Sequence, residues 1–349
     1  MKSSIGRFLF LAFPLFLALS INAYGLEAKE GLVRLVVNDT TARISLYKLV
    51  DVAKDRYVAL LFDQDPRTSF VTLSIDGRQV RLGDAADYRV AVFRTDTGDV
   101  KIEFRSSACV VREILDFAHS DGSALADGVR VSFELENISE GDSRLGLRYL
   151  LDTYLAEKSG IHFTTDQRSR VSEETAITPS SADTWVATPG DQASFMAQFS
   201  GPGIDRPDLV LLANWKRLSD SPWSFDANGQ RNFTQVPYSI NDSAMALFWE
   251  PTLVQRGATR RVSFVMGSFN PKGYPPATAA TETEQIFSST VLGSTPPDKA
   301  TAMAADLVAV RDLIARIDRA LASGAQISDD EIATWKKILD RLEERKEGY

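Results

Sequence analysis

Cysteine is nearly absent from this 349-residue sequence: Cys109 is the only one, so the chain forms no internal disulfide. Cys109 lies in "SSACVVREI", a strand-like run, where a buried apolar thiol is expected rather than a nucleophile. Histidine is scarce too, with only His119 and His162. Zinc-binding, dithiol, serine-elbow and phosphate-loop motifs are missing. The sequence therefore predicts no metal site and no cofactor.

An excess of positive charge is also missing. The chain has 39 Lys and Arg against 47 Asp and Glu, which gives a formal net charge of -8. Binding of a phosphate backbone needs clustered basic residues, so nucleic acid is excluded as an expected partner.

The chain has no long apolar run after its N-terminal segment. That segment, residues 1–25, has a basic start followed by one short apolar stretch. Lys2 and Arg7 precede an apolar stretch that ends at Leu19, and Ala23 and Gly25 are the small residues of a cleavage site. We expect a signal peptide that is cleaved after Gly25, with retention as an anchor as the alternative. The sequence thus predicts a periplasmic or secreted protein without a transmembrane segment after cleavage.

Residues 26–269 carry short apolar-alternating runs separated by turn residues. Val129, Val131, Phe133 and Leu135 alternate with polar residues, which is typical of a strand with one wet face. No long helical pattern interrupts the series. The prediction is a mainly β fold, a large antiparallel sandwich that occupies this whole region.

The C-terminal part has a different composition. Residues 270–298 are rich in Pro, Thr and Ala and are predicted to form a linker. Residues 299–349 are predicted to form an α-helical hairpin, since apolar residues recur every three or four positions in two segments. The stripes comprise Met303, Leu307, Val310, Ile314, Ile317 and Leu321, then Ile332, Trp335, Leu339 and Leu342. We expect them to pack on each other, whereas an exposed seam through Leu307, Ile314 and Trp335 would bind a partner or form an oligomer.

Catalytic candidates are weak and come from carboxylates. Asp152 lies in the apolar run "YLLDTYL", so its side chain needs a partner or a shifted pKa. Arg148 is the expected partner. A glycosidase needs two carboxyl groups, and four residues could supply the second: Glu173, Glu174, Asp242 and Glu250. His162 is a further weak candidate.

The stretch "NWKRLSDSPWSF" at 214–225 places aromatic rings in a predicted loop between strands. Trp215, Trp223 and Phe225, with Arg217 beside them, could form a ligand platform. The rings could equally anchor the loop to the core, because large aromatics dominate burial.

The runs "VRLVVNDTTARISLYKL", "GVRVSFELENIS" and "LGLRYLLDTYL" together resemble the layout of galactose-mutarotase-like supersandwich proteins. "LGLRYLLDTYLAEKSGIHFTTD", "DLVLLANW" and "LFWEPTLVQRGATRRVSFVMG" are similar to uncharacterised exported β-sandwich proteins of bacteria, spirochaetes among them. The resemblance implies the fold. Mutarotases use His and Glu to open the sugar ring, but neither His119 nor His162 lies in matching surroundings.

Two functional hypotheses follow from these patterns. The first is a non-catalytic exported envelope protein that binds a protein partner or a glycan through the sandwich and the hairpin. The alternative is a carbohydrate-active enzyme of mutarotase-like fold that uses paired carboxylates.

Overall fold

Three antiparallel sheets make up most of the protein. The computed structural model describes residues 25–95, 98–123, 125–276, 299–323 and 329–346, so most of the predicted signal peptide and linker lies outside the described residues. The N-terminal sheet contains β1 (Leu26–Glu30), β2 (Val33–Val37), β3 (Ile44–Asp51) and β4 (Arg56–Ala59), in that order. Every strand pairing in the described part of the chain is antiparallel, which confirms the predicted fold class.

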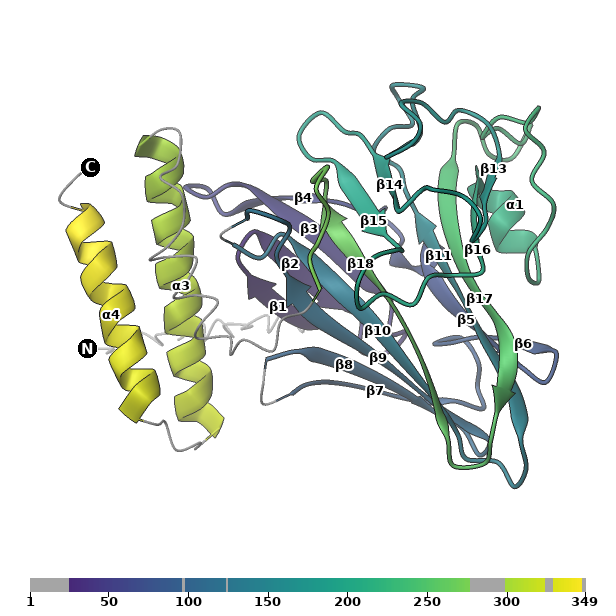
Figure 1. Cartoon of the computed structure of the whole chain (residues 1–349), viewed down its shortest axis with the longest axis horizontal. Helices are drawn as coiled ribbons and strands as arrows, with labels where there is room; N and C mark the ends of the chain where they lie inside the picture. Colours follow the sequence, from purple (N-terminus) through teal and green to yellow (C-terminus); the bar gives the residue numbers. More distant parts are fainter. Residues whose placement is uncertain (1–24, 96–97, 124, 277–298, 324–328, 347–349) are drawn as a thin grey trace, which may run out of the picture.

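Two larger sheets face each other (Figure 1). The eight-stranded sheet runs in the order β12 (Thr164–Thr165), β14 (Trp185–Thr188), β15 (Phe195–Gln198), β18 (Thr259–Ser268), β10 (Gly128–Asn137), β9 (Cys109–Ala118), β8 (Val100–Arg105), β7 (Arg89–Arg94). The six-stranded sheet runs in the order β13 (Thr175–Ile177), β16 (Leu209–Asn214), β17 (Ser243–Val254), β11 (Ser143–Asp152), β5 (Phe70–Ile75), β6 (Arg78–Arg81).

The main core lies between these two sheets. Phe133 of β10 and Phe264 of β18 both meet the ring of Tyr149 on β11 edge to face, at centroid distances of 5.8 and 5.6 Å. The alternating apolar residues predicted in β10 are all buried there, so the period-two pattern identified the inward face correctly. Burial also raises the pKa of the Cys109 thiol to about 12, as expected for an inert core residue.

Turn chemistry sets the register of the hairpins. Asp76 and Gly77 both have positive φ angles, 49° and 85°, and they connect β5 to β6. Two consecutive left-handed residues make a turn whose twist matches that of the strands, and glycine takes such an angle without strain. Between β2 and β3 the Asn38 side chain accepts hydrogen bonds from Thr40 N and Thr41 N, at 3.0 and 2.8 Å.

A second apolar layer covers the outer face of the six-stranded sheet. Helix α1 (Trp215–Asp220) lies on this face, within the stretch that the sequence pattern predicted as a loop. The prediction was wrong because Asn214 caps the helix: its side-chain oxygen accepts hydrogen bonds from Lys216 N and Arg217 N. Lys216 also pairs with Asp220 one turn later, at 2.9 Å.

The sandwich continues past the boundary expected at residue 269. Tyr274 is only 3% exposed, and its hydroxyl donates hydrogen bonds to Asp127 O and Ser268 O. Tyr274 N in turn donates to the Gln198 side chain at 2.6 Å. Residues up to about 274 are therefore held on the eight-stranded sheet, although their composition resembles that of the linker.

The C-terminal residues form two helices, α3 (Lys299–Ser323) and α4 (Asp329–Lys346). They run antiparallel, since Arg345 near the end of α4 binds Asp306 near the start of α3 at 3.0 Å. Their buried seam contains Leu313, Trp335, Ile338 and Leu342, with Val310, Ile317 and Ala320 packed against it. The expected mutual packing of the stripes is thus only half right: Leu307, Ile314, Ile332 and Leu339 are exposed.

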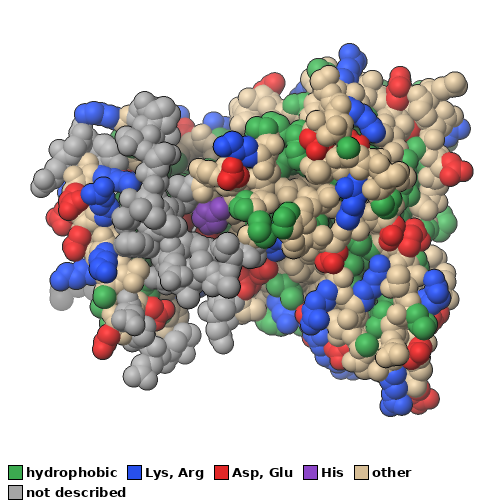
Figure 2. All heavy atoms as spheres, viewed as in Figure 1, with side chains coloured by type: hydrophobic (Ala, Val, Ile, Leu, Met, Phe, Trp, Pro, Cys, Tyr) green, Lys and Arg blue, Asp and Glu red, His purple; other side chains and the backbone are tan. Residues whose placement is uncertain are grey.

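Helix α3 lies between the sandwich and α4 (Figure 1). The Arg311 guanidinium donates hydrogen bonds to Gly31 O and to the Tyr57 hydroxyl, and the Asp312 carboxylate accepts one from Gly31 N at 2.7 Å. The hairpin therefore docks on the N-terminal sheet through polar contacts. None of the described helices is long and apolar enough to span a bilayer. Acidic and basic side chains are interspersed over the face seen in Figure 2.

Candidate functional site

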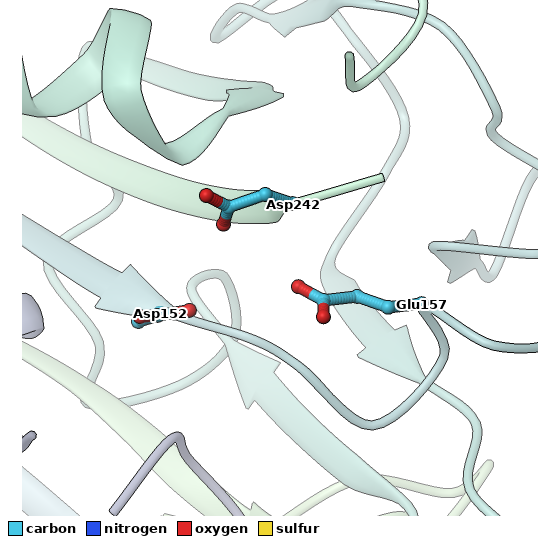
Figure 3. A group of neighbouring side chains, drawn as sticks. All are labelled: Asp152, Glu157 and Asp242. Carbon is cyan, nitrogen blue, oxygen red and sulfur yellow. The ribbon is translucent and has the colours of Figure 1, made fainter. Parts of the chain in front are cut away.

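Three carboxyl groups converge at one end of the six-stranded sheet. Asp152 is the last residue of β11, Asp242 directly precedes β17, and Glu157 lies in the loop that follows β11. One carboxylate oxygen of each lies within 4.8 Å of the others, and the side chains point toward one another (Figure 3). We refer to Asp152, Glu157 and Asp242 as the acidic trio.

Strand pairing brings the trio together. β11 and β17 are antiparallel neighbours with Asp152 opposite Ala244, so the end of one strand meets the beginning of the other. Asp152 lies on the outer face, because the preceding Leu151 points into the main core and strand side chains alternate. The outer face at this end is closed by the segment around α1, which leaves Asp152 only 5% exposed.

Hydrogen bonds hold the three residues of the trio in place. Ser239 Oγ donates to Asp242 Oδ2 at 2.5 Å, and Ser243 N donates to Glu157 Oε1 at 3.2 Å. The backbone of Asp152 is held as well, because Asp152 N donates to Ser69 Oγ at 3.0 Å. Asp242 and Glu157 are half-buried, so solvent reaches the trio from their side.

Residues at the start of α1 form hydrogen bonds with the segments that carry the trio. Trp215 N donates to Asp242 O at 3.0 Å, and the indole Nε1 of the same residue donates to Thr68 O at 2.9 Å. The buried Asn214 side chain donates to Asp242 O and to Ser239 Oγ, at 3.1 and 2.7 Å. Trp215 and Asn214 thus hold Asp242 and Ser239, whose hydroxyl group binds the Asp242 carboxylate.

Burial makes these acids hold their protons near neutral pH. Desolvation raises the pKa of Asp152 to about 7, and the negative charge of Asp242 adds to the effect. Desolvation, with Asp242 and Asp152 adding to it, raises the pKa of Glu157 to about 8. Burial raises the pKa of Asp242 as well, whereas the hydrogen bond from Ser239 opposes that rise. At pH 7 the trio therefore contains both protonated and ionised carboxyl groups.

Such an arrangement has two chemical capacities. Carboxyl groups with a pKa near the working pH can donate and accept protons, which is the requirement for general acid–base catalysis. Three carboxylate oxygens are also ligands that hard divalent cations prefer.

The predicted partner of Asp152 is bound elsewhere. The Arg148 guanidinium donates hydrogen bonds to Leu218 O, Ser221 O and Trp223 O, at 3.1, 2.8 and 3.2 Å. These carbonyl groups lie at and just after the end of α1, where helices leave acceptors unpaired. The expectation that Arg148 pairs with Asp152 was wrong because this backbone cluster takes up its donors.

Of the four residues proposed as the second carboxylate, Asp242 is the one that the structure brings to Asp152. Glu174 forms an ion pair with Arg217 at 2.5 Å and accepts a hydrogen bond from Asn228 N. Glu250 accepts hydrogen bonds from the Trp223 indole, at 3.0 and 3.2 Å. Glu173 is exposed and does not belong to the trio.

The two histidines also lie apart from the trio. His162 is buried with its ring against Phe233, at a centroid distance of 4.6 Å, and burial lowers its pKa. Burial lowers the pKa of His119 too. Both rings are therefore neutral at pH 7.

The aromatic residues of the stretch 214–225 pack against the sheet. Trp223 meets Phe248 edge to face at 5.7 Å, and Trp215 and Phe225 pack on the same outer-face cluster. The indole nitrogens of both tryptophans are bonded within the protein. These contacts are those of anchors that hold the segment on the sheet, and the proposed ligand-binding role of Trp215, Trp223, Phe225 and Arg217 stays a prediction.

No protein-family model and no curated protein matches the sequence. Among solved structures, similar ones include a galactose mutarotase-like protein from Lactobacillus casei ATCC 334, with a TM-score of 0.41 and 10% identity over 70% of this chain and 99% of that chain. A galactose mutarotase related enzyme from Lactobacillus acidophilus has a TM-score of 0.38 and 10% identity over 72% and 99%. A GalM/aldose epimerase homologue from C. elegans has a TM-score of 0.38 and 9% identity over 70% and 98%. These values are too low to decide the fold, which rests on the strand pairings.

Sequence reasoning missed Glu157. It lies in "YLLDTYLAEKSG", five residues after Asp152, where the apolar run ends. Its placement depends on how the chain turns back after β11 toward Ser243, and the sequence gives no direct sign of that turn. The sequence offered one indirect signal for Glu157. It is an acidic residue that follows shortly after a strand whose last residue, Asp152, is also acidic.

The hairpin residues proposed for partner binding fall into two groups. Leu307 and Ile314 are 55% and 54% exposed. Trp335 is only 8% exposed and belongs to the buried seam between the helices, so it is a core residue of the hairpin and not part of a binding surface.

Proposed function

We propose that the protein is a carbohydrate-active enzyme that uses the acidic trio as its acid–base machinery. The observation that carries this proposal is the convergence of three carboxyl groups within 4.8 Å, with pKa values of about 7 and 8 for Asp152 and Glu157. Strongly raised carboxyl pKa values at a partly open site are typical of catalytic acids and bases.

The environments of the three groups suggest separate roles. Glu157 is half-buried and holds its proton at neutral pH, so it suits a general acid. Asp242 is also half-buried and accepts a hydrogen bond from Ser239, which opposes the rise of its pKa by burial, so we assign it the role of general base. Asp152 is the most buried of the three, and its charge adds a small part to the effect of burial and of Asp242 on the pKa of Glu157.

Two observations support a sugar as the substrate class. The sequence layout resembles that of mutarotase-like supersandwich proteins, as described above. In addition, Tyr238 is 75% exposed and lies four residues before Asp242, next to Ser239. An exposed aromatic face beside polar carboxyl groups suits the apolar face and hydroxyl groups of a sugar ring.

The test is a panel of two kinds of substrate. Hydrolysis of aryl glycosides is measured by absorbance, and interconversion of freshly dissolved sugar anomers is measured by NMR. Glu157→Gln and Asp242→Asn should each lower kcat by about 100-fold or more for any substrate that is turned over. Glu173→Gln removes an exposed carboxylate outside the trio and serves as the matched control. Full activity in Glu157→Gln, or equal losses in Glu173→Gln, would contradict the assignment.

A substrate-independent measurement complements the panel. Protonated carboxyl groups have a distinct infrared C=O stretch, which should persist at pH 7 in the wild type. It should weaken in a variant that carries Asp152→Asn and Glu157→Gln together. An unchanged spectrum in that variant would show that the trio does not hold these protons.

The second candidate function is binding of an envelope partner by an exported protein. The exposed apolar residues of the hairpin, Leu307 and Ile314 among them, favour it. Export is supported by the signal-like residues 1–25 and by the start of β1 at Leu26, the residue at which we expect the mature chain to begin. N-terminal sequencing of native protein tests this point, and a chain that still begins with Met1 would contradict cleavage.

A further inference from the structure

One side of the helical hairpin is apolar and exposed to solvent. Its residues are Met303, Leu307, Ile314 and Leu321 on α3 and Ile332 and Leu339 on α4. Each of them is between 48% and 66% exposed. We call this set the hairpin apolar face. Contiguous exposed apolar surface on a water-soluble domain indicates an interaction site.

Helix geometry places the two parts of this face side by side. On both helices an exposed residue precedes a residue of the buried seam by three positions, as Ile314 precedes Ile317 and Ile332 precedes Trp335. Both exposed stripes are therefore rotated from the seam by the same angle and in the same sense. Since the helices are antiparallel, this common rotation brings both stripes to one side of the hairpin.

The sandwich of the same chain leaves the hairpin apolar face open, since its residues are 48% to 66% exposed. Arg311 and Asp312, which bind the N-terminal sheet, lie three and two residues before Ile314. At about 100° per residue these positions are about 60° and 160° from Ile314 around the helix, so the apolar side of α3 lies beside its docking side.

Charge and spacing indicate what covers it. Helix α3 has four basic and three acidic residues, and α4 has five basic and six acidic ones, so the two helices together have no net formal charge in a chain of net charge -8. A neutral surface with mixed charges can meet its own copy without repulsion. Leu307, Ile314 and Leu321 are spaced by seven, as are Ile332 and Leu339, which is the repeat of helices that pack together in bundles.

We propose that the occupant is a second copy of this chain, docked through the same face to form a four-helix arrangement. Helix α3 has 25 residues and is about 37 Å long, so two helices side by side offer a surface of the extent that stable dimers bury, about 1,200 to 2,000 Å² in total. A self-complementary patch of this kind gives a closed two-fold dimer. The inference is independent of the acid–base proposal.

Sedimentation equilibrium on the mature chain, Leu26–Tyr349, tests the proposal. The wild type should dimerise with a micromolar or tighter Kd. A variant with Ile314→Asp and Leu339→Asp should dimerise at least about 100-fold more weakly, because a charge buried in the interface has no partner. Both positions are exposed in the single chain, so the variant should retain the helical circular dichroism of the wild type.

Leu253→Asp is the matched control, since Leu253 is 62% exposed but lies on β17 of the sandwich. Its dimerisation should equal that of the wild type. If the aspartate variant loses helix, Ile314→Gln with Leu339→Gln repeats the test without added charge. A wild type that stays monomeric at about 100 μM, or a dimer that survives both double variants, would overturn the proposal.

Discussion

The sandwich and the helical hairpin bury their apolar residues in different ways. The six-stranded sheet is covered on both faces, by the eight-stranded sheet on one side and by α1 with its following segment on the other. The hairpin has one thin seam, and about half of its predicted apolar stripes remains exposed. An apolar pattern therefore specifies a helix or strand reliably, whereas the surface that covers the apolar residues depends on which other segments the fold brings to them.

The largest expected effect comes from removing a tryptophan in each region. Trp223→Ala should lower the free energy of unfolding of the sandwich by about 3 kcal/mol, because the indole packs on Phe248 and binds Glu250. Trp335→Ala should leave the sandwich transition nearly unchanged and reduce helical content, because Trp335 packs only within the hairpin seam. Urea unfolding followed by near- and far-UV circular dichroism separates the two effects. A stable Trp223→Ala protein with weaker ligand binding would instead favour the platform role.

An intermediate effect is expected from pH, and it concerns the sandwich alone. The folded state keeps the protons of Asp152 and Glu157 up to about pH 7 and 8, whereas the unfolded state releases them near the ordinary values of 3.8 and 4.5. Because the folded state binds more protons between these limits, its stability is greatest at the acidic end and falls as the pH rises through 7 and 8. The proton of Asp152 alone corresponds to a loss of about 2 kcal/mol between pH 5.5 and 8.5, and the proton of the half-buried Glu157 adds to this loss.

Comparison with a variant isolates this contribution. Glu113, in the main core, also has a pKa raised by burial, to about 8, and it affects both proteins alike. The variant with Asp152→Asn and Glu157→Gln should therefore show a flatter stability profile than the wild type in thermal melts across this range. Parallel profiles would mean that the trio does not titrate as described.

The smallest effect on the sandwich is expected from deletion of residues 299–349. The deletion removes the contacts of Arg311 and Asp312 with Gly31 and Tyr57, and water can replace these hydrogen bonds at the surface. The shortened protein should unfold cooperatively, within about 1 kcal/mol of the full-length sandwich. Arg311→Ala is a smaller change with the same aim. It should weaken the docking of the hairpin on the N-terminal sheet while the hairpin remains present. An insoluble deletion product would show that the helices are part of the sandwich core.

Part of the candidate site was accessible from the sequence. Asp152 was singled out because an acid in an apolar run is costly, and Asp242 was among its four proposed partners. Glu157 was not found, and neither was the role of Asn214 and Trp215 beneath Asp242. The acidic trio is assembled by hydrogen bonds between segments about 90 residues apart, such as the bond between Thr153 and Ser243. Local sequence patterns do not encode such long-range pairings.

Side-chain periodicity and turn chemistry act over a few residues, so the strands, their inward faces, the two C-terminal helices and the turns between strands can be predicted from the sequence. The partner of each apolar face depends instead on the tertiary structure. It placed Arg148 on the carbonyl groups that follow α1, turned a predicted loop into a capped helix, and left Leu307 and Ile314 in solvent while it buried Trp335. The physical reason is that covering a surface depends on distant segments, and each donor or apolar group takes the partner that the fold brings to it.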